Sequence, residues 1–430
     1  MKKYVIAGTG SRGIESYLKP LTALYGDCAK LCGVYDTNRK RAELAAKIAS
    51  AHYEVPVFDD WAKMLKTVKP DAAIVTTVDA SHDEYVISAL EAGCDAISEK
   101  PLATDEHKLN AIYEAARKTG KKVTVTFNCR FSPTFMRVKE LLEEGVIGDI
   151  YSAHFEWLLD TSHGADYFRR WHRERRHSGS LLIHKASHHF DVLNWFVGDA
   201  PEKVNAFGSR RFYGADHPDR LSGGVNCRNC SRADKCSFYW NINSNDGYTK
   251  LYAECESEDG YLRDKCVFSD EIDIEDTLSL NIRYKNGVSA AYSLTAHSPY
   301  EGLSMALNGS GGRLELKSFY GSGVFAGVRE SAVTVFNRYG EKVNYNAPSG
   351  LITKTMREYP DIMRDMRNSG HGGSDGMLRN ALFRGMSADP LSQMADLKDG
   401  ALSIGIGIAA NISLREDRSV RLDEFIGFIQ

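Results

Sequence analysis

Histidines gather in the stretch from Trp171 to Trp195, which reads WHRERRHSGSLLIHKASHHFDVLNW. His184 and His188 are four residues apart, and this spacing places two side chains on one face of a helix. Histidine exchanges protons near neutral pH, so the pair is a candidate for acid–base chemistry. The same spacing also suits a divalent metal ion, but the sequence offers no evident third ligand nearby. The stretch therefore predicts a reactive site, with proton transfer or metal binding as its chemistry.

A second candidate is Lys100 in the tripeptide Glu99-Lys100-Pro101, which follows the short apolar run 95–98. A lysine can donate a hydrogen bond to a substrate oxygen, and burial or neighbouring charges readily lower its pKa. The simpler interpretation is a surface lysine paired with Glu99. The position at the end of an expected strand, beside a proline, favours a functional role.

A glycine-rich turn stands at the start of the chain, where Gly8-x-Gly10-x-x-Gly13 follows the apolar run 4–7 and precedes a helical pattern over 14–25. In a dinucleotide-binding unit these glycines allow a tight turn, close approach of a pyrophosphate and close packing of helix on strand. The N-terminus of the helix offers unpaired N–H groups to the phosphates. The order of strand, turn and helix favours this interpretation over a plain glycine turn.

Asp36 ends the second apolar run, 29–35, a little over 20 residues after Gly13. This fold places an acid there to bind the adenosine ribose, and the acid repels a 2′-phosphate. NAD is therefore expected, while Arg39 keeps NADP as a lesser alternative because it could pair with such a phosphate. Asp36 could also cap the helix expected over 39–49.

The elements that position these residues alternate between strand and helix. Apolar runs at 4–7, 29–35, 71–76, 95–98 and 122–127 contribute to a pattern that predicts six strands within about 127 residues. This α/β pattern is typical of a doubly wound parallel sheet, in which ligands bind at the carboxyl ends of the strands. Those ends carry the candidate residues Gly8, Asp36, Thr76, Glu99 and Asn128, and His82 opens the helix after the third strand in the pattern.

From residue 128 the pattern changes, which predicts a Rossmann domain over 1–127 and a second domain over 128–430. The second domain is expected to begin with a helix over 134–145 and to build a large, mostly antiparallel open sheet. Its expected strands are 151–159, 202–212, 277–284, 289–295 and 304–308, and its expected C-terminal helices are 359–367, 377–384 and 401–415. Residues 216–270 look like an irregular insert.

The insert contains a cysteine cluster with two interpretations. Cys227-x2-Cys230-x5-Cys236, completed by Cys266, could bind a structural zinc ion through four thiolates. The alternative is a set of partly buried free thiols, which the unusual order of the cysteines favours slightly. In either case a structural role is expected for this cluster rather than a catalytic one.

Composition excludes several classes of partner. The 430 residues are 43% hydrophobic and 26% charged, with a net charge of −3, so neither nucleic acid nor another polyanion is an expected partner. No apolar stretch approaches the length of a membrane span, and the N-terminus shows no secretory signal, so we expect a cytoplasmic chain. A cluster of basic side chains has two interpretations. It indicates either an acidic or highly hydroxylated substrate or a solvated basic helix face, and its members are Arg169, Arg170, His172 and Arg173.

The chain resembles the Gfo/Idh/MocA oxidoreductases, a family that includes glucose–fructose oxidoreductase and inositol 2-dehydrogenase. The resemblance spans essentially the whole chain. It is carried by Gly8-Thr9-Gly10-Ser11-Arg12-Gly13, Asp36, His82, Glu99-Lys100-Pro101, Asn128-x-Arg130-Phe131-x-Pro133 and the stretch from Gly179 to Asp191. The resemblance implies a tightly held NAD or NADP, a sugar or polyol substrate, and oligomerisation through the C-terminal sheet. It assigns Ser11, Arg12 and the strand-end residues to the cofactor, and it matches Lys100 and His188 to the catalytic lysine and histidine of the family.

The chain departs from the family at His184, where relatives commonly carry an aspartate that orients and charges the lysine. This departure puts the usual proton relay in doubt. The expected function is hydride transfer between the cofactor and a sugar, polyol or sugar derivative, with Lys100, His184 and His188 as catalytic candidates. The alternatives are a redox-assisted glycoside hydrolase or epimerase that recycles its cofactor in place, and a ligand-binding regulator without turnover.

Overall fold

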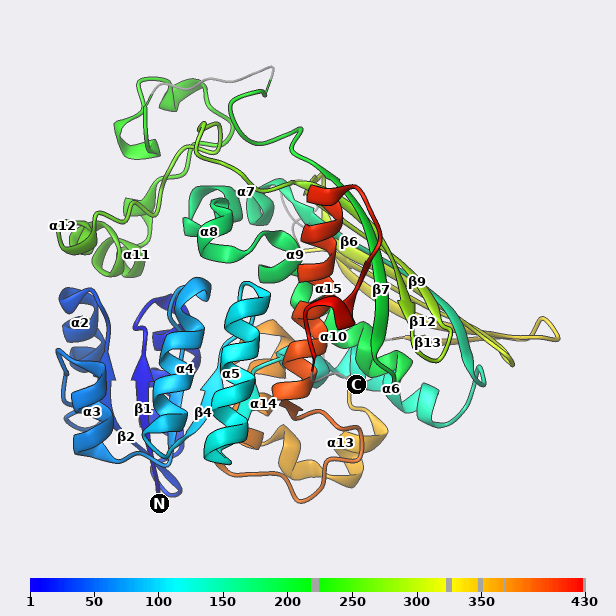
Figure 1. Ribbon diagram of the computed structural model, residues 1–430, viewed down its shortest axis with the longest axis horizontal. Coiled ribbons are helices and arrows are strands. Elements are labelled where there is room, and N and C mark those ends of the chain that lie inside the picture. Colours follow the sequence, from blue (N-terminus) through cyan, green and yellow to red (C-terminus); the bar gives the residue numbers. More distant parts are fainter. Residues whose placement is uncertain (218–223, 322–326, 347–350, 367–368, 428–430) are drawn as a thin grey trace.

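The computed structural model describes residues 1–217, 224–321, 327–346, 351–366 and 369–427. Two sheets organise this part of the chain, a six-stranded sheet at the N-terminal end and a nine-stranded sheet built by the rest. In Figure 1 the smaller sheet and its helices, in blue and cyan, lie beside the large sheet in green and yellow.

The smaller sheet is a Rossmann-like parallel sheet, as predicted. Its parallel strands are β1 (Lys2–Ala7), β2 (Ala29–Tyr35), β3 (Ala72–Val75), β4 (Asp95–Ser98) and β5 (Val123–Val125), and the order across the sheet is β14-β5-β4-β3-β1-β2. β3 is buried at every residue, which explains why it is a continuous apolar run rather than an alternating one. The expectation of six strands before residue 128 is wrong, because the sixth strand is β14 (Ala395–Asp396), which pairs antiparallel with β5 from far along the chain.

Helices connect the parallel strands and cover the sheet. A π-helical segment (Gly13–Leu18) runs into α1 (Lys19–Leu24), and further helices follow: α2 (Arg39–Ala49), α3 (Trp61–Val68), α4 (His82–Glu91) and α5 (Glu106–Thr119). Asn38, Asp60 and Asp105 cap α2, α3 and α5 by accepting hydrogen bonds from backbone N–H groups of the first turn. The cap of α2 is therefore Asn38, and the alternative role of Asp36 as that cap is wrong.

The nine-stranded sheet is mostly antiparallel, as predicted. Its strand order is β13-β12-β11-β10-β6-β9-β8-β7-β15, and of these neighbouring pairs β6–β9 is parallel and the others are antiparallel. Five strands correspond to the sequence predictions: β6 (Ile150–Asp160), β7 (Pro201–Ser209), β8 (Thr277–Tyr284), β9 (Ser289–Ser298) and β10 (Glu301–Gly309). Four were not predicted: β11 (Gly312–Tyr320), β12 (Arg329–Asn337), β13 (Lys342–Asn346) and β15 (Val420–Arg421).

Helices pack against one face of the large sheet and reach back to the smaller one (Figure 1). They are α6 (Pro133–Glu143), α7 (Thr161–Arg169), α8 (Arg175–Ser178), α9 (Leu181–His184), α10 (Ala186–Val197), α14 (Ser374–Phe383) and α15 (Leu397–Glu416). α15 contributes Ile406 to the core of the large sheet and Ile404 to the core around β5, so it ties the two sheets together.

The prediction of a helix over 359–367 is wrong for the residues of this range that the structure describes. The chain instead forms α13 (Lys354–Glu358), a non-helical residue at Tyr359, and a single 3₁₀ turn over Pro360–Met363. A proline disfavours helical backbone at the residue before it, which ends α13 at this point. Residue 367 itself lies outside the described residues.

The predicted insert leaves the large sheet after β7 and returns at β8. Its described part holds single helical turns and two short helices, α11 (Asp246–Leu251) and α12 (Glu256–Asp259). Figure 1 places both helices next to α2, on the side of the smaller sheet. None of the helices in the described ranges is both long enough and apolar enough to cross a membrane.

Candidate functional site

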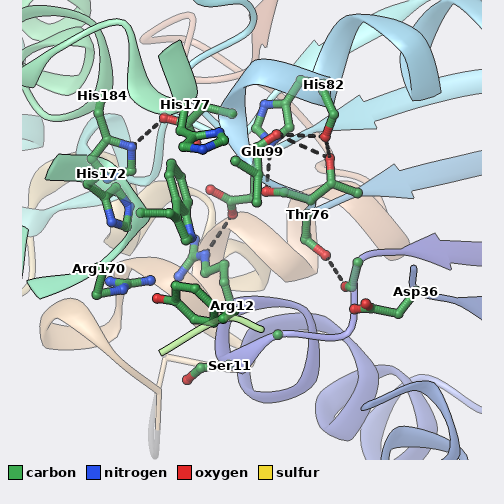
Figure 2. Close-up of a pocket in the computed structure, with 18 of the residues that line it drawn as sticks. Ser11, Arg12, Asp36, Thr76, His82, Glu99, Arg170, His172, His177 and His184 are labelled. Atoms are coloured by element: carbon green, nitrogen blue, oxygen red, sulfur yellow. Dashed lines mark hydrogen bonds and ion pairs between the residues drawn. The ribbon is translucent and has the colours of Figure 1, made fainter. Parts of the chain in front are cut away.

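A cavity of about 780 Å³ lies where the carboxyl ends of the parallel strands face α7 to α10. Its volume is in the range of small-molecule and cofactor sites. Every residue predicted for catalysis or cofactor binding except Gly13 lines it: Gly8, Gly10, Ser11, Arg12, Asp36, Thr76, His82, Glu99, Lys100, Asn128, His184 and His188. Figure 2 shows Asp36 on one side of the cavity and His172, His184 and Arg170 on the other.

The glycine turn has the geometry that its sequence predicts. Gly8 has a φ of +88°, and a Cβ there would lie 2.6 Å from the backbone carbon of Thr76. A Cβ on Gly13 would lie 2.3 Å from the carbonyl oxygen of Gly8, so only glycine allows the helix to approach the strand. A Cβ on Gly10 would meet nothing closer than the Tyr252 hydroxyl at 3.7 Å. The chain itself therefore leaves space at Gly10 for a ligand, as a pyrophosphate site requires.

Asp36 is held in place by the loops around it. Its Oδ2 accepts a hydrogen bond from Thr9 N at 2.7 Å, and its Oδ1 accepts one from Asn38 N at 2.8 Å. The nearest guanidinium is that of Arg41, whose Nε lies 3.5 Å from Asp36 Oδ1. Arg39, the residue that kept NADP as an alternative, instead pairs with Glu43 on the outer face of α2.

Arg12 links the glycine turn to both domains. Its Nε lies 2.7 Å from Glu99 Oε1, and its Nη1 lies 3.4 Å from Asp375 Oδ1. Burial alone would raise the pKa of Glu99, but the charge of Arg12 and a hydrogen bond from Tyr17 lower it below its usual range. Asn128 donates a 2.8 Å hydrogen bond to Asp375. Glu99 is thus an ionised anchor for Arg12 rather than a free acid, and Asn128 faces this network.

His82 positions the turn that carries Lys100. Its Nδ1 lies 2.7 Å from the carbonyl oxygen of Pro101, and its Nε2 lies 3.2 Å from that of Thr77. Both ring nitrogens are therefore engaged by the backbone, although the ring lines the cavity.

Lys100 meets His184 at the centre of the cavity. Its Nζ donates to the carbonyl oxygen of His184 at 2.9 Å and lies 3.5 Å from His184 Nε2. Burial lowers the pKa of Lys100 to about 8, since the interior penalises the ammonium, while the carboxylates of Asp79 and Glu99 oppose this shift. Lys100 can therefore exchange its proton near neutral pH.

A carboxylate reaches His184 from another element. Asp79, three residues after Thr76, places its Oδ2 2.5 Å from His184 Nδ1. Burial lowers the pKa of His184 well below its usual range, and so do the charges of Lys100 and His172. Burial also raises the pKa of Asp79 well above its usual range, while the charge of Lys100 opposes this shift. Because the Lys100 ammonium faces Nε2, we place the proton that Asp79 and His184 share at Nδ1. Asp79, His184 and Lys100 then form a continuous chain, which the sequence analysis missed.

His188 lines the same cavity from the first turns of α10. Its Nδ1 is buried without a hydrogen-bond partner. Burial lowers the pKa of His188 well below its usual range, and the charges of Lys100 and Lys185 add to this. His188 is therefore neutral near pH 7 and can accept a proton. The two histidines do not share one helix as the spacing predicted, because α9 ends at His184 and α10 begins at Ala186.

Other residues of the cavity escaped the sequence analysis. They are His163, Tyr167, Trp171 and Lys185 from the C-terminal domain, His371 from the segment before α14, and Arg41, Tyr252, Asp259 and Tyr261 around the nucleotide end. Asp79 and Lys185 had a usable signal, because each stands within three residues of a residue that was predicted. Tyr252 and Tyr261 had none, since they come from a loop more than 200 residues away from the glycine turn.

The four basic residues between positions 169 and 173 lie in two different places. Arg170 and His172 line the cavity, whereas Arg169 donates to Cys227 Sγ at 3.5 Å and Arg173 is fully buried away from the cavity. Asp166 pairs with both Arg170 and Arg263, so this side of the cavity keeps an excess of positive charge. The solvated-face interpretation therefore does not hold for these residues.

The cysteine cluster does not form a metal site in the described residues. Cys227, Cys230, Cys236 and Cys266 line one small pocket, and all four are free thiols. No group of three or more His, Cys, Asp or Glu side chains in the described ranges is arranged to hold a metal ion. The zinc expectation is thus unsupported, as is the metal interpretation of His184 and His188, and the thiol interpretation agrees with the structure.

Replacement of Asp79 by asparagine tests the chain to Lys100. The Asp79 carboxylate raises the pKa of Lys100, so D79N should lower that pKa and deprotonate the lysine at lower pH. Activity that requires a charged Lys100 falls as pH rises through about 8 in the parent. In D79N it should fall at lower pH, with a loss of roughly 5-fold at pH 8 if the pKa drops by one unit. The pH profile of kcat/KM measures this shift.

The matched control is Asp83→Asn, because Asp83 lies four residues after Asp79, in α4, and pairs with Lys108 outside the cavity. D83N should keep the parent profile. An unshifted alkaline limb in D79N would remove Asp79 from the relay.

Comparisons with known proteins agree with this geometry. The family described as "Oxidoreductase family, NAD-binding Rossmann fold" matches residues 2–127, and its "C-terminal alpha/beta domain" matches residues 139–422. The chain is 33% identical to YteT of Bacillus subtilis (strain 168), over 99% of this chain and 98% of YteT. It is 29% identical to an inositol 2-dehydrogenase of Paracoccus denitrificans (strain Pd 1222), over 46% of this chain and 54% of that one.

Solved structures share the fold. An oxidoreductase from Agrobacterium radiobacter in complex with NAD⁺, L-tartaric acid and magnesium superposes with a TM-score of 0.64 at 16% identity, covering 99% of both chains. A levoglucosan dehydrogenase in complex with NADH and levoglucosan gives 0.63 at 20% identity, covering 98% of this chain and 99% of that one. With both family domains matched along the chain, this protein belongs to the Gfo/Idh/MocA family of oxidoreductases.

Proposed function

We propose that this protein transfers a hydride between NAD and a CH–OH group of a sugar, polyol or sugar derivative. The observation that carries this proposal is the single cavity in which Lys100, His184 and His188 face the glycine turn and Asp36. The residues present fit a dinucleotide, because Gly10 leaves space at the turn and Asp36 presents a carboxylate to the cavity.

In this proposal, the nicotinamide supplies the hydride acceptor when the cofactor is bound. Neutral His188 accepts the proton of the substrate hydroxyl, which becomes a carbonyl as its carbon loses the hydride. Lys100, charged by its proximity to Asp79 and Glu99, donates a hydrogen bond to the oxygen on which negative charge develops. His184 holds Lys100 in place through its carbonyl oxygen and its ring, and Asp79 fixes the tautomer of that ring.

NAD is the proposed cofactor in preference to NADP. Asp36 lines the nucleotide end, and Arg41 beside it is paired with both Asp36 and Asp259. A 2′-phosphate there would lie against two carboxylates whose arginine is already engaged, and this costs free energy.

The substrate class rests on relatives and on charge. Two of the similar proteins are named for inositol and levoglucosan, both polyhydroxylated rings. The wall opposite the nucleotide adds Lys100, Lys185 and Arg170, which favour a substrate that also carries an anionic group.

A substrate screen on the purified protein tests the proposal. Sugars, polyols and sugar acids are added with NAD⁺, and NADH absorbance and product are followed together. Net NADH formation with a hydroxylated substrate is the expected result. Product without net NADH would identify the recycled-cofactor alternative, a glycoside hydrolase or epimerase, and the absence of turnover on the whole panel would favour a ligand-binding regulator.

We further propose that two or more copies associate through the large sheet. β8 alternates buried and exposed residues, and Ser279, Asn281 and Arg283 lie on its exposed face. Helices pack against the opposite face (Figure 1), so this face is available for a second copy.

A further inference from the structure

The insert between β7 and β8 extends from the sheet that it leaves to the cofactor half of the molecule (Figure 1). Ile242, Leu251 and Tyr252 belong to the same hydrophobic core as Tyr4 and Ile14 of the Rossmann half. Asn38 donates a buried 2.9 Å hydrogen bond to the carbonyl oxygen of Cys255. The insert is therefore packed onto the dinucleotide-binding unit through buried contacts.

Tyr252 reaches the glycine turn itself. Its hydroxyl accepts a 3.0 Å hydrogen bond from Ser11 N, one of the N–H groups that this turn offers to a pyrophosphate. A phenol that accepts one hydrogen bond keeps its own proton free to donate, and a phosphate oxygen in the space beside Gly10 is a suitable acceptor. Tyr252 is thus placed to bind the pyrophosphate from the side opposite the Rossmann sheet.

Tyr261 supplies an independent observation. Its hydroxyl is buried and has no hydrogen-bond partner, although the residue lines the cavity. A buried hydroxyl without a partner costs free energy, and a ligand that supplies the partner removes that cost. Asp259, Gly260 and Leu262 line the same wall of the cavity.

Salt bridges fasten this wall to α2. Arg41 pairs with Asp259 while facing Asp36, which binds the adenosine ribose in the proposed site. Lys40 donates a 2.7 Å hydrogen bond to Ser257, next to these residues. Arg263 lies 5.0 Å over the Trp240 ring and 5.8 Å over the Tyr252 ring, and it also pairs with Asp166 of α7. The insert is fixed to both domains, on either side of the nucleotide.

From these contacts we infer that residues 246–262 form the outer wall of the dinucleotide site, bind the pyrophosphate through Tyr252 and Tyr261, and retain the cofactor between turnovers. This inference rests on the dinucleotide site of the proposed function. A cofactor enclosed by this wall leaves only when the contacts of Arg41 and Asn38 to the insert open.

The first test is the dissociation rate of NADH, measured by fluorescence after mixing the NADH complex with excess NAD⁺. The double variant Y252F/D259A should release NADH roughly 10-fold faster or more, since it loses the Tyr252 hydroxyl at the glycine turn and the salt bridge between Asp259 and Arg41. The control Glu43→Ala removes an acid of α2 that pairs with Arg39 at the surface, away from the cavity and from residues 246–262, and should keep the parent rate. An unchanged rate in a folded double variant would overturn the inference.

The second test needs no variant and remains valid if the double variant does not fold. Amide hydrogen exchange of the full chain is compared with and without NADH. Protection of both 8–13 and 246–262 is the expected result. Protection of 8–13 alone would show that the insert does not contact the cofactor and would overturn the inference while leaving the proposed function intact. Protection of neither segment would overturn both.

Discussion

Replacement of Lys100 by methionine should reduce turnover by about 10³-fold, the loss expected when a donor to a developing oxyanion is removed from a buried site. Methionine keeps the length and apolar body of the side chain but removes the hydrogen bond to His184 and the charge beside Asp79. The glycine turn and Asp36 are untouched, so NADH should still bind. Initial rates with the substrate found in the screen, together with an NADH fluorescence titration, measure the two effects separately.

The matched control is Lys63→Met, because Lys63 is exposed, pairs with Asp59 and does not line the cavity. K63M should keep the parent rate within about twofold, as surface changes usually do. A K100M rate within 10-fold of the parent, with binding and folding intact, would show that Lys100 does not act on the substrate. A loss of NADH binding as large as the loss of turnover would assign Lys100 to the cofactor instead.

Replacement of His188 by asparagine should reduce kcat by roughly 10²- to 10⁴-fold, the range for loss of a positioned general base. Asparagine fits in the space of the imidazole but cannot accept the hydroxyl proton near neutral pH. Burial holds the pKa of His188 in the parent well below its usual range, so the acid limb of its kcat/KM profile should lie below the range of an ordinary histidine. In H188N that limb should disappear, and the rate should rise with hydroxide concentration instead.

His189→Asn is the control for stability, since His189 follows His188 on the same helix, is equally enclosed and donates or accepts a 2.7 Å hydrogen bond with Tyr292 outside the cavity. H189N should lower Tm because a buried hydrogen bond is lost, while kcat stays within about twofold. Equal losses of kcat in the two variants would mean that His188 acts through packing alone.

These two predictions concern side chains that the sequence could identify but not connect. Lys100 and His188 stood out by residue type and by resemblance. The resemblance also led us to expect an aspartate at position 184 that keeps Lys100 charged, and this chain has a histidine there. Asp79 supplies that carboxylate through His184, from a segment more than 100 residues earlier in the chain. A hydrogen bond between residues so far apart in the sequence depends on how the two domains face each other. No local sequence pattern encodes that arrangement.

The sequence by itself determined the parallel half of the fold. Buried parallel strands are continuous apolar runs, and the turns after them need glycine or a capping acid, so residue types reveal both the strands and their ends. For the same reason the glycine turn, Asp36 and the strand-end residues were found before any coordinates. A Cβ would lie 2.6 Å from a backbone atom at Gly8 and 2.3 Å from one at Gly13, so each position requires glycine. The residue type alone therefore reveals this requirement.

Only the tertiary structure decided the rest. β14 completes the first sheet from residues 395–396, because edge pairing depends on where a distant segment passes and leaves no periodic signal in two residues. The cysteines of the insert drew attention to a metal site, yet the described residues place its tyrosines, not its thiols, at the cofactor cavity. A tyrosine in an irregular loop has the same local pattern whether it faces solvent or a glycine turn, and packing of the insert onto the Rossmann half determines which it does.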